Sequence, residues 1–180
     1  MRAIVSVLEG PMAEEIRSLW RLLEGECGLK GIRMTPIPHF SWHVAEEYNS
    51  AELRAALEQV CSGQKSFRVR TAGLGIFGGG EPVIYIALVN NEAMRKLHRK
   101  IWRFARRIAT SPSPYYDPDS WIPHITLAHT DVNADNIGCA LRQLAFRPLE
   151  FEFEVDNLAI VYQHEERVGR LSERFQFGGD

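Results

Sequence analysis

The stretch WIPHITLAH at residues 121–129 has a looser counterpart earlier in the chain, PIPHFSWHV at residues 36–44. In both, proline and histidine precede an apolar residue, a hydroxyl residue and a second apolar residue. A single His-x-Ser or His-x-Thr is expected by chance in a chain with 6 histidines, whereas a repeated five-residue pattern is much harder to obtain by accident. We therefore interpret the repeat as functional and expect each copy to lie on a β-strand.

The repeat places an imidazole and a hydroxyl at the same spacing in each strand. Because side chains alternate between the two faces of a strand, His39 and Ser41 are expected to share a face. The same holds for His124 and Thr126. Each imidazole is then about 7 Å from its hydroxyl at the Cα level, a span that side chains can close around a small anion. If the strands face each other, two imidazoles and two hydroxyls converge.

This set of groups suits the cleavage of a phosphodiester. One group must take a proton from the attacking oxygen and another must protonate the leaving oxygen, and imidazole titrates close to neutral pH. The hydroxyls can donate hydrogen bonds to the non-bridging phosphate oxygens, where charge increases during the reaction. Such chemistry needs no metal ion and no other cofactor, so we expect neither.

Two further histidines lie close to the repeats. By strand alternation His43 shares the face of His39, so it can contact a substrate, although packing in the core is an equally open alternative. His129 is expected on the face opposite to His124. A metal ion shared by His39 and His43 is not expected, because residues i and i+4 of a strand are about 13 Å apart. No carboxylate or cysteine is spaced to complete a metal site.

The rest of the chain alternates predicted strands with predicted helices in the order βαβαββαβαββ. This order favours an α+β protein of two similar lobes over a doubly wound parallel sheet, and we expect residues 1–180 to form a single domain. Strands are predicted at 3–8, 33–45, 67–71, 83–89, around the second repeat, and at 151–163 and 168–177 around the turn EERVGR; helices are predicted from 11 to about 28, at 51–60, at 91–109 and at 133–146.

Composition and charge are those of an ordinary globular protein. The 180 residues are 45% hydrophobic and 24% charged, and 21 Lys plus Arg stand against 23 Asp plus Glu, for a net charge of -2. No overall positive field therefore attracts long nucleic acid, and any nucleic-acid partner should be held at a local site. No stretch approaches the roughly 20 apolar residues of a membrane span. We expect a cytoplasmic monomer without membrane contact.

The three cysteines Cys27, Cys61 and Cys139 are odd in number and widely spaced. This pattern favours free thiols in a reducing compartment over a disulfide framework. The glycines at 73–78 match GxGxxG, but a strand follows instead of a helix, so a hairpin turn is favoured over a dinucleotide site.

One predicted helix is unusually basic, and one loop is rich in aromatic residues. The basic face of the helix at 91–109 is expected to be a solvated surface, with an RNA-tracking surface as the alternative; its His98 lies on the apolar side and is expected to be structural. Tyr115, Tyr116 and Trp121 precede the second repeat and suit stacking on a base, with packing of the loop onto the body as the alternative.

HFSW at 39–42 and HITL at 124–127 resemble the paired HxTx motifs of the two-histidine (2H) phosphoesterase superfamily, which includes the 2'-5' RNA ligase-like proteins and cyclic phosphodiesterases. The stretch GLGIFGGGEPVIYIAL at 73–88 and the order of elements are also similar to that family. The resemblance implies a bilobal α+β fold, with mainly antiparallel sheet, outer helices and a central cleft. It also implies metal-independent chemistry on 2',3'-cyclic phosphates or 2'-5' linkages of RNA or small nucleotides.

Carried over position by position, the resemblance implies that His39 and His124 are the acid-base pair. It also implies that Ser41 and Thr126 bind the phosphate. Ser41 replaces the commoner threonine, and His129 stands close to where many relatives have arginine.

The leading hypothesis is a cyclic phosphodiesterase with His124 as base and His39 as acid in hydrolysis and a pH profile with both limbs near neutrality. Substrate contacts are expected from His43, Tyr116 and Trp121. The alternative is a nucleotide-binding or RNA-end-binding protein with little or no catalytic activity.

Overall fold

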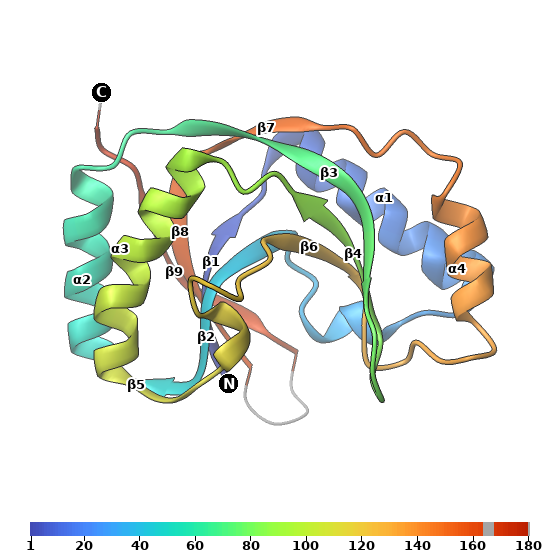
Figure 1. The fold of residues 1–180 in the computed structure, drawn as a ribbon, viewed down its shortest axis with the longest axis horizontal. Coiled ribbons are helices and arrows are strands. Elements are labelled where there is room, and N and C mark those ends of the chain that lie inside the picture. Colours follow the sequence, from blue (N-terminus) through green and yellow to red (C-terminus); the bar gives the residue numbers. More distant parts are fainter. Residues whose placement is uncertain (164–167, 180) are drawn as a thin grey trace.

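The computed structural model describes residues 1–163 and 168–179. Within them, nine strands form one strongly curved sheet in the order β7-β3-β4-β6-β2-β1-β8-β9, with β5 paired to β2, and the strand pairings are antiparallel (Figure 1). The elements are β1 Arg2–Val7, α1 Gly10–Cys27, η1 Gly31–Met34, β2 His39–Tyr48, α2 Ser50–Ser62, β3 Phe67–Phe77, β4 Val83–Leu88, α3 Glu92–Ile108, β5 Ala109–Pro112, η2 Pro114–Tyr116, β6 His124–Ala128, α4 Ile137–Leu144, β7 Glu152–Val155, β8 Asn157–Tyr162 and β9 Arg170–Gln176.

The sheet consists of two similar halves that meet where β2 pairs with β6. One half contains β2, β1, β8 and β9 and is covered by α2 and α3; the other contains β6, β4, β3 and β7 and is covered by α1 and α4 (Figure 1). The predicted α+β fold of two related lobes is therefore confirmed. Each half contributes one copy of the repeated motif at its inner strand.

The predicted elements differ from the observed ones in several places. The segment 151–163 forms two strands, β7 and β8, which are interrupted at Asp156. Gly73 and Gly75 lie within the long strand β3 and not in the turn that joins it to β4. The segment 33–45 begins with the end of η1, and α4 starts only at Ile137. The predicted turn at 165–170 falls partly outside the described residues.

The helix ends follow from local sequence. Pro11 lies in the first turn of α1, and Gly28 ends the helix with φ 71°, a left-handed conformation that glycine adopts without strain. The side chains of Asn49 and Asn91 accept hydrogen bonds from main-chain N–H groups in the first turns of α2 and α3. Among the described residues, no helix combines the length and apolar character required to traverse a bilayer.

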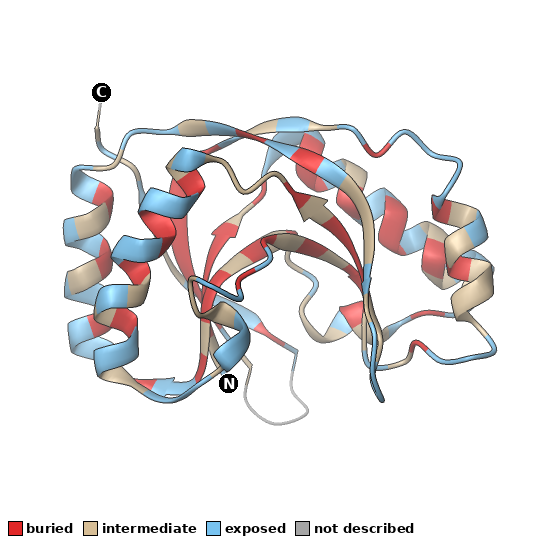
Figure 2. Ribbon diagram, viewed as in Figure 1, coloured by how far each residue is buried: buried red, intermediate tan, exposed pale blue. Residues whose placement is uncertain are grey.

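The two faces of the sheet are packed differently. The main core lies between the sheet and the helices and includes Ile4, Phe40 and Trp42, each with no exposed area (Figure 2). A smaller cluster built around Val5, with Val44 packed against it, is separate from that core. Since Ile4 and Val5 are consecutive in β1, the two clusters lie on opposite faces of the sheet.

Cys27 and Cys139 form a disulfide, which corrects the prediction of free thiols. The two residues are 112 positions apart in sequence, but the end of α1 packs against α4 and brings their Cα atoms to 5.7 Å. Cysteine spacing carries no information about which helices pack together, and this is why the sequence did not indicate the bond. The remaining cysteine, Cys61, is free and buried.

Candidate active site

The two copies of the motif meet through one pair of apolar residues. Phe40 of β2 pairs with Ile125 of β6 in antiparallel register, and neither residue has exposed area. Continuing this register by one residue in each direction sets His39 opposite Thr126 and Ser41 opposite His124. Because neighbouring residues of a strand point to opposite faces, all four side chains lie on the face away from Phe40. We call this surface the histidine face.

The antiparallel register sets the spacing of these groups. Directly opposite residues have Cβ atoms about 5 Å apart, and diagonal neighbours such as His39 and His124 are about 7–8 Å apart. The charges of His39 and His124 interact, since His124 contributes to lowering the pKa of His39. The structure therefore brings together the two imidazoles and two hydroxyls that the sequence singled out.

Each imidazole of the motif is oriented by a carbonyl two residues before it. The Nδ1 atom of His39 lies 2.6 Å from the Ile37 carbonyl oxygen, and Nδ1 of His124 lies 2.7 Å from that of Ile122. A carbonyl oxygen only accepts, so Nδ1 carries the proton in both rings. In the neutral imidazole Nε2 then holds the lone pair, and this atom is available for proton transfer in both motifs.

Burial lowers the pKa of both histidines below the usual 6.5. For His39, the Ile37 carbonyl opposes this effect, while nearby His124 and His129 lower the pKa further. For His124, burial is the main cause and the Ile122 carbonyl opposes it. Both imidazoles are therefore predominantly neutral at pH 7 in the free protein, a state suited to a general base.

Each motif contains a β-bulge at the residue after the hydroxyl. In β2, Ser41 pairs with Val5 and His43 with Ile4, so Trp42 is an extra residue. In β6, Thr126 pairs with Tyr85 and Ala128 with Ile84, so Leu127 is the extra residue. An extra residue reverses the alternation of side chains beyond it. The predicted faces of the histidines that follow were therefore both wrong.

His43 lies on the helix side of the sheet and not on the histidine face. It has no exposed area, its ring centroid is 5.2 Å from that of Trp102 in α3, and its Nδ1 lies 2.6 Å from the Tyr48 hydroxyl oxygen. Burial lowers its pKa to about 4. The core alternative left open by the sequence is the one observed, so a direct substrate contact by His43 is not carried further.

His129 is brought to the histidine face by the bulge at Leu127. It is partly exposed, and its charge contributes to lowering the pKa of His39. Its own pKa is lowered by burial and raised by the carboxylates of Asp131 and Glu81. The site therefore includes a third imidazole, which strand alternation had assigned to the opposite face.

An indole N–H donates a hydrogen bond to the main-chain carbonyl of each hydroxyl residue of the motifs, Ser41 and Thr126. Trp121 Nε1 lies 3.1 Å from the Ser41 carbonyl oxygen, and Trp20 Nε1 lies 3.1 Å from that of Thr126. Both indoles are buried, with 5% and 8% of their residue surface exposed. Trp20 belongs to α1, more than a hundred residues away from the second motif, and no sequence signal connected the two.

The aromatic loop before β6 is largely packed onto the protein. Trp121 stacks on His98 with ring centroids 3.9 Å apart. Its ring therefore packs within the protein and is not free to stack on a base. Tyr116 is half-buried; burial raises its pKa, and a hydrogen bond with the Ser41 side chain lowers it. Tyr115 is 77% exposed. Substrate contact by Tyr116 stays a prediction.

Aromatic side chains also surround His124. Phe77 and Tyr85 stack on each other with centroids 4.1 Å apart and lie 4.9 and 5.1 Å from the imidazole of His124. A Cβ atom on Gly75 would come within 2.4 Å of the Tyr85 ring, so only glycine admits that ring. Within residues 1–163 and 168–179, no group of three or more His, Cys, Asp or Glu side chains is placed to hold a metal ion.

Comparisons with known proteins agree with the fold. The family model described as the 2'-5' RNA ligase superfamily matches residues 8–167. Protein TT0787 of Thermus thermophilus has a similar structure, with a TM-score of 0.70 and 21% identity over 99% of this chain and 98% of that one. A structure described as a phosphoesterase has a TM-score of 0.61 and 15% identity over 98% of each chain. E. coli LigT, complexed with NADP+, has a TM-score of 0.59 and 13% identity over 98% of this chain and 96% of that one. A search of curated protein sequences finds no significant match.

Proposed function

Because the chain belongs to the 2'-5' RNA ligase superfamily, a group of phosphoesterases and RNA-ligase-like enzymes, we propose that it cleaves 2',3'-cyclic phosphates or 2'-5' phosphodiester linkages of RNA or small nucleotides without a metal ion. The observation that carries this proposal is the antiparallel pairing of Phe40 with Ile125, which places His39 and His124 on one face. Two imidazoles with free Nε2 atoms supply an acid and a base at the same phosphorus.

In the proposed hydrolysis, the Nε2 lone pair of His124 takes a proton from a water molecule whose oxygen attacks the cyclic phosphorus. A new P–O bond forms, and one of the two P–O bonds to ribose breaks. The protonated Nε2 of His39 gives its proton to the departing ribose oxygen, so the product is a nucleoside phosphomonoester. In the ligating direction the two histidines exchange roles.

The hydroxyls of Ser41 and Thr126 are proposed to bind the non-bridging oxygens of the phosphate. They lie opposite the two imidazoles in the strand register, on either side of the Phe40–Ile125 pair. Charge accumulates on the non-bridging oxygens as the attacking oxygen bonds to phosphorus, so these hydrogen bonds strengthen in the transition state. His129, when protonated, adds a positive charge beside the same oxygens.

The direct test is turnover of a 2',3'-cyclic nucleotide followed by phosphorus NMR in the presence of a chelator. The wild-type protein should convert it to a phosphomonoester, and His39→Ala and His124→Ala should each lose roughly 10²–10⁴ of the rate. The double variant should lose little more than either single variant, because the two groups act in one step. Binding without conversion by the wild-type protein would favour the alternative of a nucleotide-binding protein.

The hydroxyls are tested separately. Ser41→Ala and Thr126→Val should each lower kcat by roughly 10²-fold, the usual effect of removing one donor to a developing oxyanion. Thr110→Val, which removes an exposed hydroxyl from β5, is the matched control and should retain full activity. Full activity in the Ser41 and Thr126 variants would remove them from the phosphate site.

A further inference from the structure

Helix α3 holds a large share of the positive charge of this chain. Seven of its residues are lysine or arginine, out of 21 in the whole protein, and its only acidic residue is Glu92. All seven are exposed: Arg95, Lys96, Arg99, Lys100, Arg103, Arg106 and Arg107. Since the net charge of the chain is -2, the positive potential is local to this helix.

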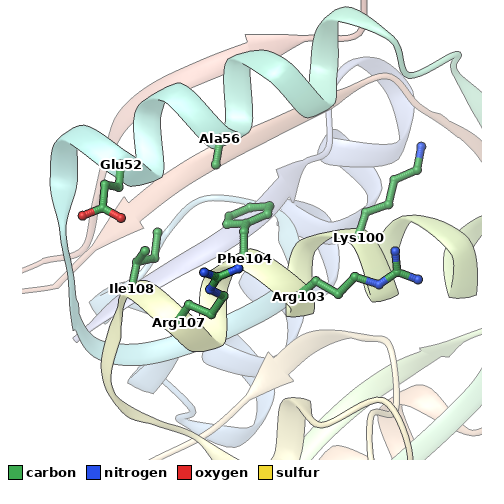
Figure 3. Close-up of a pocket in the computed structure, with 7 residues that line it drawn as sticks. All are labelled: Glu52, Ala56, Lys100, Arg103, Phe104, Arg107 and Ile108. Atoms are coloured by element: carbon green, nitrogen blue, oxygen red, sulfur yellow. The ribbon is translucent and has the colours of Figure 1, made fainter.

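A groove of about 440 Å³ runs between α3 and α2 beside this charged face (Figure 3). Lys100, Arg103 and Arg107 line it from α3, and these positions share one side of the helix because they are spaced by three and four residues. The ring of Phe104 lies between these cations and Ala56 of α2 (Figure 3). The groove therefore combines a row of cations with an aromatic surface.

The cations of this groove have few countercharges nearby. Lys96 pairs with Glu92 within α3 at 2.7 Å, but no ion pair with a described residue is found for Lys100, Arg103 or Arg107. Among the residues that the structure describes, one acidic residue lines the groove, Glu52, which accepts a hydrogen bond from the Asn49 side chain. The groove consequently carries net positive charge and suits an anionic ligand.

We propose that the groove between α2 and α3 binds the phosphate backbone of single-stranded RNA, with a base against the Phe104 ring. Lys100 and Arg107 are seven residues apart, which corresponds to about 10 Å along the helix, so one ligand must carry more than one anionic group to contact both. A cationic row with an aromatic surface is the arrangement by which proteins hold single-stranded nucleic acid without sequence preference.

This inference rests on the proposed function for the choice of RNA over other polyanions, and it narrows the substrate class. The groove lies on the helix side of the sheet, since α3 packs there against His43 through Trp102. The histidine face is on the other side. A mononucleotide bound at the histidine face cannot also occupy the groove. An oligonucleotide bound by its end at the histidine face can extend to the groove. The groove therefore selects RNA ends over small cyclic nucleotides.

The test compares two substrates on two variants of equal charge. The groove variant is Lys100→Ala/Arg103→Ala/Arg107→Ala, and the control is Arg21→Ala/Arg142→Ala/Arg147→Ala, which removes three cations from the α1 and α4 side. The substrates are an oligoribonucleotide of about ten residues ending in a 2',3'-cyclic phosphate and the corresponding cyclic mononucleotide, since single-stranded sites span roughly this length.

For the groove variant, KM for the oligoribonucleotide should rise at least tenfold, while kcat/KM for the mononucleotide should stay within about twofold of wild type. The slope of log KM against log salt concentration should also decrease in size by about 2, because each phosphate contact to a single strand contributes about 0.7. The control variant should match wild type on both substrates. Equal effects of the groove variant on both substrates, or no effect on either, would overturn the proposal.

Binding measurements separate this inference from the proposed function. An oligoribonucleotide with a 3'-phosphate is followed by fluorescence anisotropy with wild type, the groove variant and the milder Arg103→Gln, and circular dichroism checks that each is folded. Weakened RNA binding in a protein without turnover supports the groove and rejects only the reaction. Polyglutamate that binds more tightly than the RNA would instead indicate an acidic protein partner and overturn the proposal.

Discussion

The indole N–H of Trp121 donates a hydrogen bond to the main-chain carbonyl of Ser41 across 3.1 Å, and Trp20 repeats this contact with Thr126 at the same distance. The two contacts come from unrelated parts of the chain, one from the loop before β6 and the other from α1. In both cases the carbonyl belongs to the residue that precedes a β-bulge, where the regular ladder is interrupted. Each hydroxyl is thus positioned by a donor from outside its strand pair.

Removing either indole N–H should therefore impair the site as well as the fold. Trp121→Phe and Trp20→Phe leave a buried carbonyl without its donor, at a cost of about 1–3 kcal/mol in unfolding free energy. Because the displaced hydroxyl is proposed to bind the phosphate in the transition state, we expect kcat to fall with little change in KM. Trp102→Phe, which changes an indole on α3, is the control and should keep kcat. Loss of stability with unchanged kcat would give the indoles a structural role alone.

The pH profile of kcat/KM should be displaced to acidic pH. Burial lowers the pKa of both His39 and His124 below 6.5, and the proposed mechanism requires one neutral and one protonated imidazole. The rate therefore rises through the lower pKa and falls through the higher, with both limbs below 6.5 in the free enzyme. A bound phosphate anion favours the protonated rings, so the kcat profile should lie at higher pH. A kcat/KM optimum above pH 7 would contradict these shifts.

His129→Ala should move the alkaline limb of kcat/KM, which follows the loss of the proton from the proposed acid His39, to higher pH. The positive charge of His129 is one cause of the lowered pKa of His39, so its removal raises that pKa. His129→Arg, which keeps a permanent charge there, should leave the limb at the wild-type pH or below it. The alanine variant should also show a higher KM for an anionic substrate. If the limb does not shift in His129→Ala, the charge of His129 does not affect the pKa of His39.

Acid should destabilise the protein through two histidines outside the site. Burial lowers the pKa of both His43 and His98 to about 4. The unfolded chain takes up protons at its ordinary pKa of 6.5, so the stability present above pH 6.5 is lost as the pH falls toward 4. A shift of this size corresponds to on the order of 3 kcal/mol for each residue at pH 4.

Urea unfolding at pH 7 and pH 4 measures this effect. His43→Phe and His98→Phe should each show a smaller difference in unfolding free energy between the two pH values than wild type. Parallel pH dependence in wild type and variants would mean that these histidines titrate normally.

Reduction of the Cys27–Cys139 disulfide should lower the unfolding free energy. The bond joins residues 112 positions apart, and closing so long a loop in the unfolded chain is worth about 2–4 kcal/mol. Cys139→Ser should show the same loss, and a reductant should not destabilise this variant further. Thiol titration of the unfolded, unreduced protein should detect one thiol, that of Cys61. Three reactive thiols would show that the bond does not form.

The sequence determined the local elements and the chemical groups of the site. Alternating apolar patterns, asparagine caps and glycine ends placed the helices and most strands, because these signals act over a few residues. The repeated motif indicated His39, Ser41, His124 and Thr126 as one constellation. It did so because the same chemical groups occur twice in the sequence at the same spacing.

Only the tertiary structure decided which face each neighbouring residue occupies and what supports it. One extra residue in β2, Trp42, turned His43 into the core, and one in β6, Leu127, turned His129 toward the site. Bulges, the indole contact from Trp20 and the Cys27–Cys139 bond depend on which distant segments pack together. Strand register and helix packing minimise free energy over the whole chain, so no local pattern records them.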